Sequence, residues 1–158
     1  MTNATDNKDT KIRDLEELAG ILSSLRAEGQ KIVHCHGVFD LLHIGHMRHL
    51  KQAKGLGDVL VVTVTADEYV NKGPGRPVFT EDLRAEAIAA LDCVDYVAVN
   101  RSPMAVPAIE LLRPNLYVKG HDYEDAASDR TGGTDLERDA IASVGGEVAF
   151  TGDITFSS

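Results

Sequence analysis

The chain has 158 residues, which is enough for one domain with a hydrophobic core that needs neither disulfides nor structural metals. Its formal charge of −9 excludes broad affinity for nucleic acid or for an anionic membrane surface. Apolar residues make up 43% and charged residues 26% of the chain, as in an ordinary globular protein. A small anionic substrate stays open, because it responds to the local field of its pocket and not to the net charge.

Cysteine usage and hydropathy indicate a reducing, aqueous compartment. Cys35 and Cys93 lie on predicted buried segments without Cys-x-x-Cys spacing, which favours a cytoplasmic protein over a disulfide framework. We find no apolar run long enough to span a bilayer and no secretory leader, so no membrane partner is expected. Residues 1–10 are polar and are predicted to form a disordered tail before a domain over residues 11–158.

The first half of the chain is predicted to alternate helices and strands. A capping box at residues 14–17 opens a helix that ends at Gly29. The elements that follow are a strand over residues 31–36, a turn over 37–46, a helix from about Gly45 to Gly55 and a buried strand over 59–64.

The second half continues the same alternation after a long loop over residues 67–79, which is rich in glycine and proline. Thr80 is predicted to cap a helix whose buried face carries Leu83, Ala87, Ile88 and Leu91. The remaining predicted elements are a strand over residues 94–99, a helix from Ser102-Pro103 to Leu112, a strand over 115–119, a helix opened by a second capping box at 134–137 and ended at 145–146, and a strand over 147–150.

Short strands that alternate with helices predict an α/β fold with a five-stranded parallel sheet flanked by helices. We expect a single, Rossmann-like, doubly wound domain. In such sheets ligands bind at the carboxyl ends of the strands, near the topological switch point.

The turn over residues 37–46 (GVFDLLHIGH) carries the candidate chemistry. It leaves the first strand and enters a helix, so backbone N–H groups and the positive end of the helix meet there. Gly37 permits close approach of a ligand, and Gly45 permits the sharp turn into the helix. His43 and His46 are three residues apart, which places both imidazoles on one side. Two ring N–H donors there suit a phosphate that gains negative charge in a transition state.

Two other interpretations of these histidines were weighed. Either ring could merely cap the helix or fill the core, but two histidines, two glycines and an acid at the ligand-binding end of a sheet favour a functional site. A zinc site is the second alternative, although no regular ligand spacing supports it. The histidines concerned are His34, His36, His43, His46 and His49.

The ten residues 37–46 resemble the signature of the cytidylyltransferase-like nucleotidyltransferase superfamily. Similar proteins are the adenylyltransferase domain of bifunctional heptose kinase/adenylyltransferases and glycerol-3-phosphate cytidylyltransferase, and the similarity covers residues 11–158. The resemblance implies that a sugar or polyol phosphate attacks the α-phosphate of a nucleoside triphosphate in line and that pyrophosphate leaves. The protein would supply positioning and charge neutralisation, with Mg²⁺ held through the nucleotide phosphates and no direct protein ligand.

The resemblance also implies roles for individual residues. His43 and His46 match histidines that bind the phosphates around the reacting phosphorus. Lys72 and Arg84 match cations that reach the phosphates, and Arg76 matches a residue at the end of the loop over residues 67–79. A solvated surface charge is the alternative for each cation. The residues expected to bind the nucleotide are Gly37, Val38, Phe39, Asp40, Gly45, Gly120, Asp122, Ser157 and Ser158.

Two distal segments refine the resemblance. Residues 118–123 resemble a Gly-x-Asp-Tyr segment, in which Asp122 could hold a ribose hydroxyl, a magnesium-bound water or a neighbouring loop. Gly152 stands where the cytidylyltransferases carry an arginine, which favours the heptose branch and AMP transfer over cytidylyl transfer. A nucleotide-binding module without turnover stays open as an alternative. The end of the chain predicts a domain of a longer, kinase-fused protein, and the resemblance suggests a homodimer.

Overall fold

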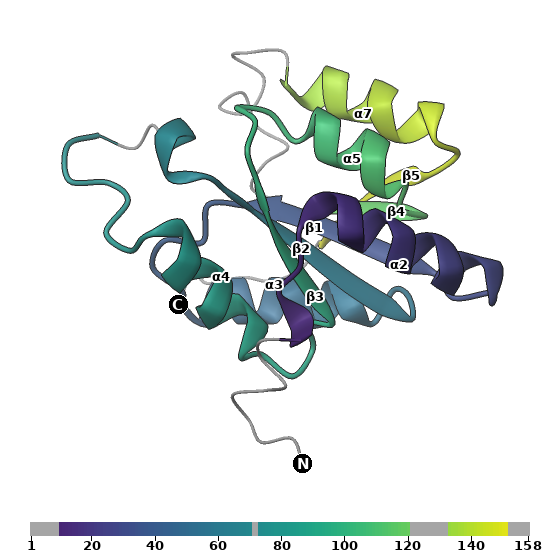
Figure 1. Cartoon of the computed structure of the whole chain (residues 1–158), viewed down its shortest axis with the longest axis horizontal. Helices are drawn as coiled ribbons and strands as arrows, with labels where there is room; N and C mark the ends of the chain where they lie inside the picture. The colour runs from purple at the N-terminus through teal and green to yellow at the C-terminus, as the bar shows by residue number, and fades with distance from the viewer. Residues whose placement is uncertain (1–9, 71–72, 121–132, 152–158) are drawn as a thin grey trace.

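A computed structural model describes residues 10–70, 73–120 and 133–151, which form one sheet covered by helices (Figure 1). All strand pairs are parallel, and the strand order is β3-β2-β1-β4-β5. This order confirms the predicted doubly wound sheet of five parallel strands. Residues 1–9 of the predicted tail lie outside the described part. The strands are β1 (Ile32–Gly37), β2 (Val59–Thr65), β3 (Tyr96–Asn100), β4 (Leu116–Gly120) and β5 (Glu147–Thr151).

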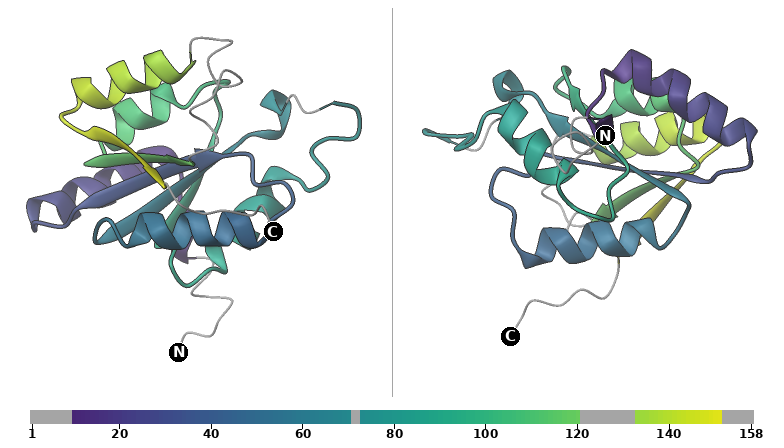
Figure 2. Two further views of the ribbon diagram at one scale, coloured as in Figure 1. Left: turned by 180° about the vertical axis from the view of Figure 1, so that it is seen from behind. Right: turned by 60° about the horizontal axis from the view of Figure 1, so that its bottom comes forward.

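Helices cover both faces of the sheet, as the two views of Figure 2 show. One face packs against α3 and α4, and the opposite face packs against α2, α5 and α7. The chain winds outward from β1 through β2 to β3 and then returns to place β4 on the other side of β1, so the switch point lies between β1 and β4. The helices are α2 (Leu15–Ala27), α3 (Ile44–Lys54), α4 (Glu81–Ala89), α5 (Val106–Leu112) and α7 (Gly133–Ser143), with a 3-10 turn η1 (Asp67–Tyr69) after β2.

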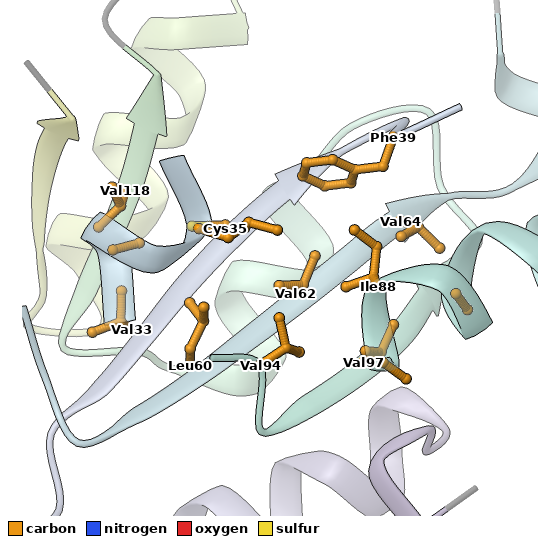
Figure 3. Close-up of a cluster of buried hydrophobic side chains, with 14 residues drawn as sticks. Val33, Cys35, Phe39, Leu60, Val62, Val64, Ile88, Val94, Val97 and Val118 are labelled. Carbon is orange, nitrogen blue, oxygen red and sulfur yellow. The ribbon is translucent and has the colours of Figure 1, made fainter. Parts of the chain in front are cut away.

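The largest hydrophobic core lies between the sheet and the α3/α4 layer (Figure 3). It is built mainly from β-branched side chains, which pack well on a pleated surface. Every second residue of the central strands enters it, as the period of a strand requires. The labelled members are Val33, Cys35, Phe39, Leu60, Val62, Val64, Ile88, Val94, Val97 and Val118.

Both predicted capping boxes are wrong in detail. Asp14 is the N-cap of α2 but its side chain makes no capping bond, and Glu17 accepts instead from Arg13 at 2.8 Å. Helix α7 begins at Gly133, so Thr134 lies inside the helix, and the carboxylate of Glu137 binds residues of β4. In both cases the glutamate expected to cap the helix binds a cationic side chain instead, Arg13 for Glu17 and Lys119 for Glu137.

Two further predictions about helices needed correction. Helix α5 begins at Val106 and not at Ser102-Pro103, because the side chain of Asn100 donates to the carbonyl oxygen of Met104 and closes a turn there. In α4 the cap at Thr80 is confirmed, with its Oγ1 accepting from the Leu83 N–H at 3.4 Å. Leu83 and Ala87 are nevertheless exposed, and the inward positions belong to Arg84, Ala85, Ile88 and Ala89.

Candidate active site

The two histidines of the 37–46 turn are locked together at the start of α3. His43 is the N-cap, and its Nδ1 accepts from the Gly45 N–H at 3.0 Å. The His43 N–H in turn points at Nδ1 of His46 at 3.4 Å, which completes a reciprocal cap. The two ring centroids lie 4.0 Å apart, so the prediction that both imidazoles share one side is confirmed.

This hydrogen bonding also selects the tautomer of each ring. A ring nitrogen that accepts a backbone N–H carries no proton, so in the neutral imidazole the proton sits on Nε2. In each ring Nε2 is therefore the donor, held by a capping bond at the other nitrogen. Capping and anion binding use different atoms of the same side chain, so the capping role does not exclude the functional one.

The ring of Phe39 packs against the ring of His46. Phe39 has a left-handed backbone (φ 52°), and its buried ring meets the His46 ring edge to face at 5.5 Å. A Cβ at Gly37 would lie 2.9 Å from the Phe39 ring, so any larger residue at position 37 would force that ring to move. Gly37 thus serves packing in this structure, and its predicted role in ligand approach stays a prediction.

Asp40 fastens the end of the loop before α4 to the histidine turn. Its carboxylate accepts from the Val78 N–H at 2.7 Å, the Phe79 N–H at 2.9 Å and Nη1 of Arg76 at 3.1 Å. Burial alone would raise the pKa of Asp40, but the bonds from Phe79, Val78 and Arg76 together lower it below its usual value. The predicted nucleotide contact of Asp40 stays untested, whereas its contact with the loop is part of the structure.

Arg84 is a fully buried junction of three segments. Its guanidinium donates to the carbonyl oxygens of Val38 at 2.9 Å, Thr65 at 2.7 Å and Phe79 at 3.0 Å. It also donates to Oδ1 of Asp67 at 2.7 Å, so protein groups occupy four of its five N–H donors. Arg84 therefore joins the histidine turn, the end of β2 and the start of α4, and its predicted phosphate contact stays a prediction.

The structure thus brings most of the predicted site residues to one place, the turn after β1 and the loop end that Asp40 and Arg84 attach to it. Gly120 ends β4 on the neighbouring strand. The other predicted residues, Lys72, Asp122, Ser157 and Ser158, lie outside the described part of the chain. Sequence patterns did not single out Thr65 and Asp67, since only folding brings these partners to Arg84.

Three other histidines, His34, His36 and His49, make polar contacts to threonines, and His121 lies outside the described part of the chain. His34 Nε2 and His36 Nδ1 both lie 2.8 Å from Thr63 Oγ1, which confirms that they share one strand face. Burial lowers the pKa of His34 to about 3 and that of His36 to about 4, so both rings are neutral. His49 Nδ1 lies 2.8 Å from Thr151 Oγ1. Within residues 10–70, 73–120 and 133–151, no three histidine, cysteine or acidic side chains gather around a common metal position.

Comparison with known proteins assigns this arrangement to a family. Residues 34–144 match the Cytidylyltransferase-like family. The chain belongs to that family. This confirms the resemblance predicted from the histidine turn. The chain is similar to the bifunctional protein HldE of Geobacter metallireducens, with 42% identity over 90% of this chain and 28% of that protein. It is also similar to the bifunctional protein HldE of Syntrophotalea carbinolica, with 41% identity over 89% of this chain and 28% of that protein.

Solved structures show the same architecture. The lipopolysaccharide core biosynthesis protein of Thermoplasma volcanium matches with a TM-score of 0.66 and 26% identity, over 80% of this chain and all of that one. Pantoate-beta-alanine ligase of Francisella tularensis matches with a TM-score of 0.61 and 16% identity, over 92% of this chain and 68% of that one. The second likeness concerns the fold alone. In the helices that the structure describes, we find none with the length and apolar character to span a membrane.

Proposed function

We propose that the protein transfers a nucleoside monophosphate, AMP by preference, from a nucleoside triphosphate to the phosphate of a sugar phosphate. The observation that carries this proposal is the pair of Nε2 donors of His43 and His46 at the start of α3, next to the switch point. The similarity to HldE proteins supports the same reaction. Because the chain spans 28% of those two relatives, activity and substrates are proposed for this domain alone.

The proposed chemistry needs no protein nucleophile. An oxygen of the acceptor phosphate forms a bond to the α-phosphorus, and the bond from that phosphorus to the bridging β-oxygen breaks. Pyrophosphate leaves with the electron pair. The Nε2–H groups of His43 and His46 would donate to phosphate oxygens whose negative charge grows in the transition state. Both rings are held by capping bonds before substrate binds, so little reorganisation is needed during the reaction.

Magnesium belongs to the proposal as a companion of the nucleotide. The donors at the turn are imidazole N–H and backbone N–H groups, which suit phosphate oxygens and not a hard cation. Both carboxylate oxygens of Asp40 already accept N–H bonds. We therefore propose that Mg²⁺ is held by the phosphates, where it would neutralise charge on the leaving pyrophosphate.

We also propose a reducing cytoplasmic setting and a partner domain in the complete protein. Cys35 and Cys93 are both free thiols, which is consistent with a reducing cytoplasm. The relatives are named bifunctional and are much longer than this chain, which supports a partner domain, a kinase by the resemblance, in the complete protein. A homodimer rests on the resemblance alone.

Pyrophosphate release tests the proposed function directly. The chain is mixed with Mg²⁺, one of ATP, CTP, GTP or UTP, and one of glucose 1-phosphate, mannose 1-phosphate, a heptose phosphate or glycerol 3-phosphate. We expect turnover with ATP and a sugar phosphate. Turnover only with CTP and glycerol 3-phosphate would support a cytidylyltransferase instead. Nucleotide binding, read as a raised melting temperature, without turnover of any pair would support a nucleotide-binding module and contradict the proposal.

A further inference from the structure

The sheet face that packs against α2, α5 and α7 changes character along the strands. At the amino ends it is apolar, with Ile32 on β1 and Val61 on β2 in a core with α2 and α5. Toward the carboxyl ends the same face carries polar side chains. These are His34 and His36 on β1, Thr63 and Thr65 on β2, Asn100 on β3 and Lys119 on β4. On the opposite face, β2 stays apolar as far as Val64. The polarity is therefore a feature of one face and one end of the sheet.

At this end of the sheet, β1 and β4 lose their pairing. The described register pairs Val33 with Leu116 and His34 with Tyr117, and pairs no residues beyond them between these two strands. By contrast, β1 stays paired with β2 as far as Gly37 and Val64. The two strands at the switch point therefore separate before they end, and this is the place where doubly wound sheets take their ligands.

A partly buried ion pair between β4 and α7 lies beside this separation. Lys119 Nζ is 2.6 Å from Oε1 of Glu137, and the two side chains are 11% and 15% exposed. The other carboxylate oxygen of Glu137 accepts from the Tyr117 hydroxyl at 3.2 Å. Burying such a pair generally contributes no more stability than well-packed apolar side chains of the same size. Stability alone therefore does not account for the pair, and its place at the carboxyl ends of the strands is the basis for considering a role in ligand binding.

His36 completes the polar surroundings of the pair. Burial, and next to it the nearby charge of Lys119, lower the pKa of His36 to about 4. Its Nδ1 bonds to Thr63 and its Nε2 lies 3.4 Å from Thr65 Oγ1. His36, Thr63 and Thr65 thus place neutral donors and acceptors beside the ammonium of Lys119.

We propose that Lys119 and Glu137, beside His36, bind the hydroxyl groups of the sugar while its phosphate lies at His43 and His46. A carboxylate accepts from a hydroxyl and an ammonium donates to one, so the pair matches two neighbouring hydroxyls of a sugar ring. A phosphate alone would be repelled by Glu137, which excludes Lys119 as a simple anion site. The inference rests on the proposed function and names the part of the acceptor that the enzyme selects.

Kinetics of a paired substitution test the inference. In the double variant Lys119→Met/Glu137→Met, apolar side chains replace the ion pair, so a merely structural pair could be lost without harm. We expect the KM for the sugar phosphate that the wild type uses to rise about 10-fold or more, as for loss of polar contacts to substrate hydroxyls. The KM for ATP should stay within about 2-fold of the wild-type value, because the substitutions remove contacts to the sugar and not to the nucleotide. Glu137→Gln, which keeps the shape of the side chain, should shift the same constant if the double variant does not fold.

The ion pair of Lys54 and Asp95 supplies a matched control. Its Nζ···Oδ2 distance is also 2.6 Å, but it lies beside the amino ends of β2 and β3. Lys54→Met should leave both KM values unchanged.

An acceptor KM within 2-fold of wild type in a folded double variant, or in Glu137→Gln, would overturn the inference while the proposed function stands. Absence of wild-type turnover would count against the function instead. In that case calorimetric titration with mannose 1-phosphate, in the presence of a non-hydrolysable ATP analogue, compares binding to wild type and variants. Equal affinities, or no binding to wild type, would then overturn the inference.

Discussion

His43 has two jobs that a single substitution can separate. Asparagine is a good N-cap residue and keeps an acceptor for the Gly45 N–H, but it lacks the Nε2–H donor. We expect His43→Asn to change the free energy of unfolding by less than about 1 kcal/mol and to lower kcat by about 100-fold or more. Alanine should also lower kcat and cost about 1 kcal/mol of stability. Urea unfolding and pyrophosphate release measure the two effects, and full activity of His43→Asn would contradict the proposed mechanism.

Arg84 is expected to matter for stability before it matters for substrate. Arg84→Met leaves three carbonyl oxygens and the Asp67 carboxylate without their donor, which should cost about 3 kcal/mol. Arg13→Met supplies the contrast, since it removes an exposed pair with Glu17 and should cost less than about 1 kcal/mol. Denaturant unfolding measures both variants. If Arg84→Met were as stable as wild type, the junction role would be wrong.

At the scale of single residues, the sequence predicted proximity better than partners. The side-by-side placement of His43 and His46 followed from a spacing of three at a helix start, which is local geometry. The role of Arg84 depends on carbonyl groups of Val38 and Thr65, which are distant in the sequence. No local pattern encodes such contacts, so the junction at Arg84 was not predicted, and its phosphate contact stays a prediction.

Among the elements, the loop end at residues 76–79 depends most on one side chain. Asp40→Asn should speed hydrogen exchange at Val78 and Phe79, because an amide nitrogen cannot accept their N–H bonds. The pKa of Asp40 is lowered in the folded state, so its contribution to stability is present above the usual aspartate pKa and is lost as the pH falls through the folded value. The difference in stability between wild type and variant should therefore shrink in acid.

Asp58→Asn is the control for this loop. Asp58 also accepts a backbone N–H bond, from Lys31 at 2.8 Å, but at the amino ends of β1 and β2. The Asp58→Asn variant should leave hydrogen exchange at Val78 and Phe79 unchanged. Exchange measured by NMR or mass spectrometry decides the matter, and unchanged protection of both amides in Asp40→Asn would refute the anchoring role.

Strands were predicted more accurately than helix starts, for a physical reason. The run over residues 59–64 is rich in β-branched and apolar residues, and the observed β2 extends it by one residue. Helix starts depend on which partner a polar side chain chooses. The carboxylate of Glu137 binds Lys119 on β4 and does not cap its own helix. The side chain of Asn100 closes a turn with Met104, so α5 begins only at Val106. Such choices are made between elements and leave no trace in one segment.

The molecule as a whole should lose stability in mild acid because of His34 and His36. Both pKa values are lowered, to about 3 and about 4, with burial as the main cause. Below pH 6.5 the unfolded chain binds protons that the folded state does not, so stability falls as the pH drops toward the folded values. From pH 6.5 to pH 5 we expect a loss of about 2 kcal/mol for each histidine. Urea unfolding across this range measures it, and His36→Gln should flatten the profile. A flat wild-type profile would contradict the prediction.

The reciprocal cap at His43 and His46 has a consequence for how such a domain changes over generations. Serine, threonine, aspartate and asparagine are the residues that cap helices best, and histidine is not among them. In a protein that kept the fold without catalysis, one of those four residues at position 43 would cap α3 at least as well as histidine. If the outer nitrogen of His43 has the proposed role, histidine should be kept at this cap in active members of the family, and a member with asparagine there should have lost the activity.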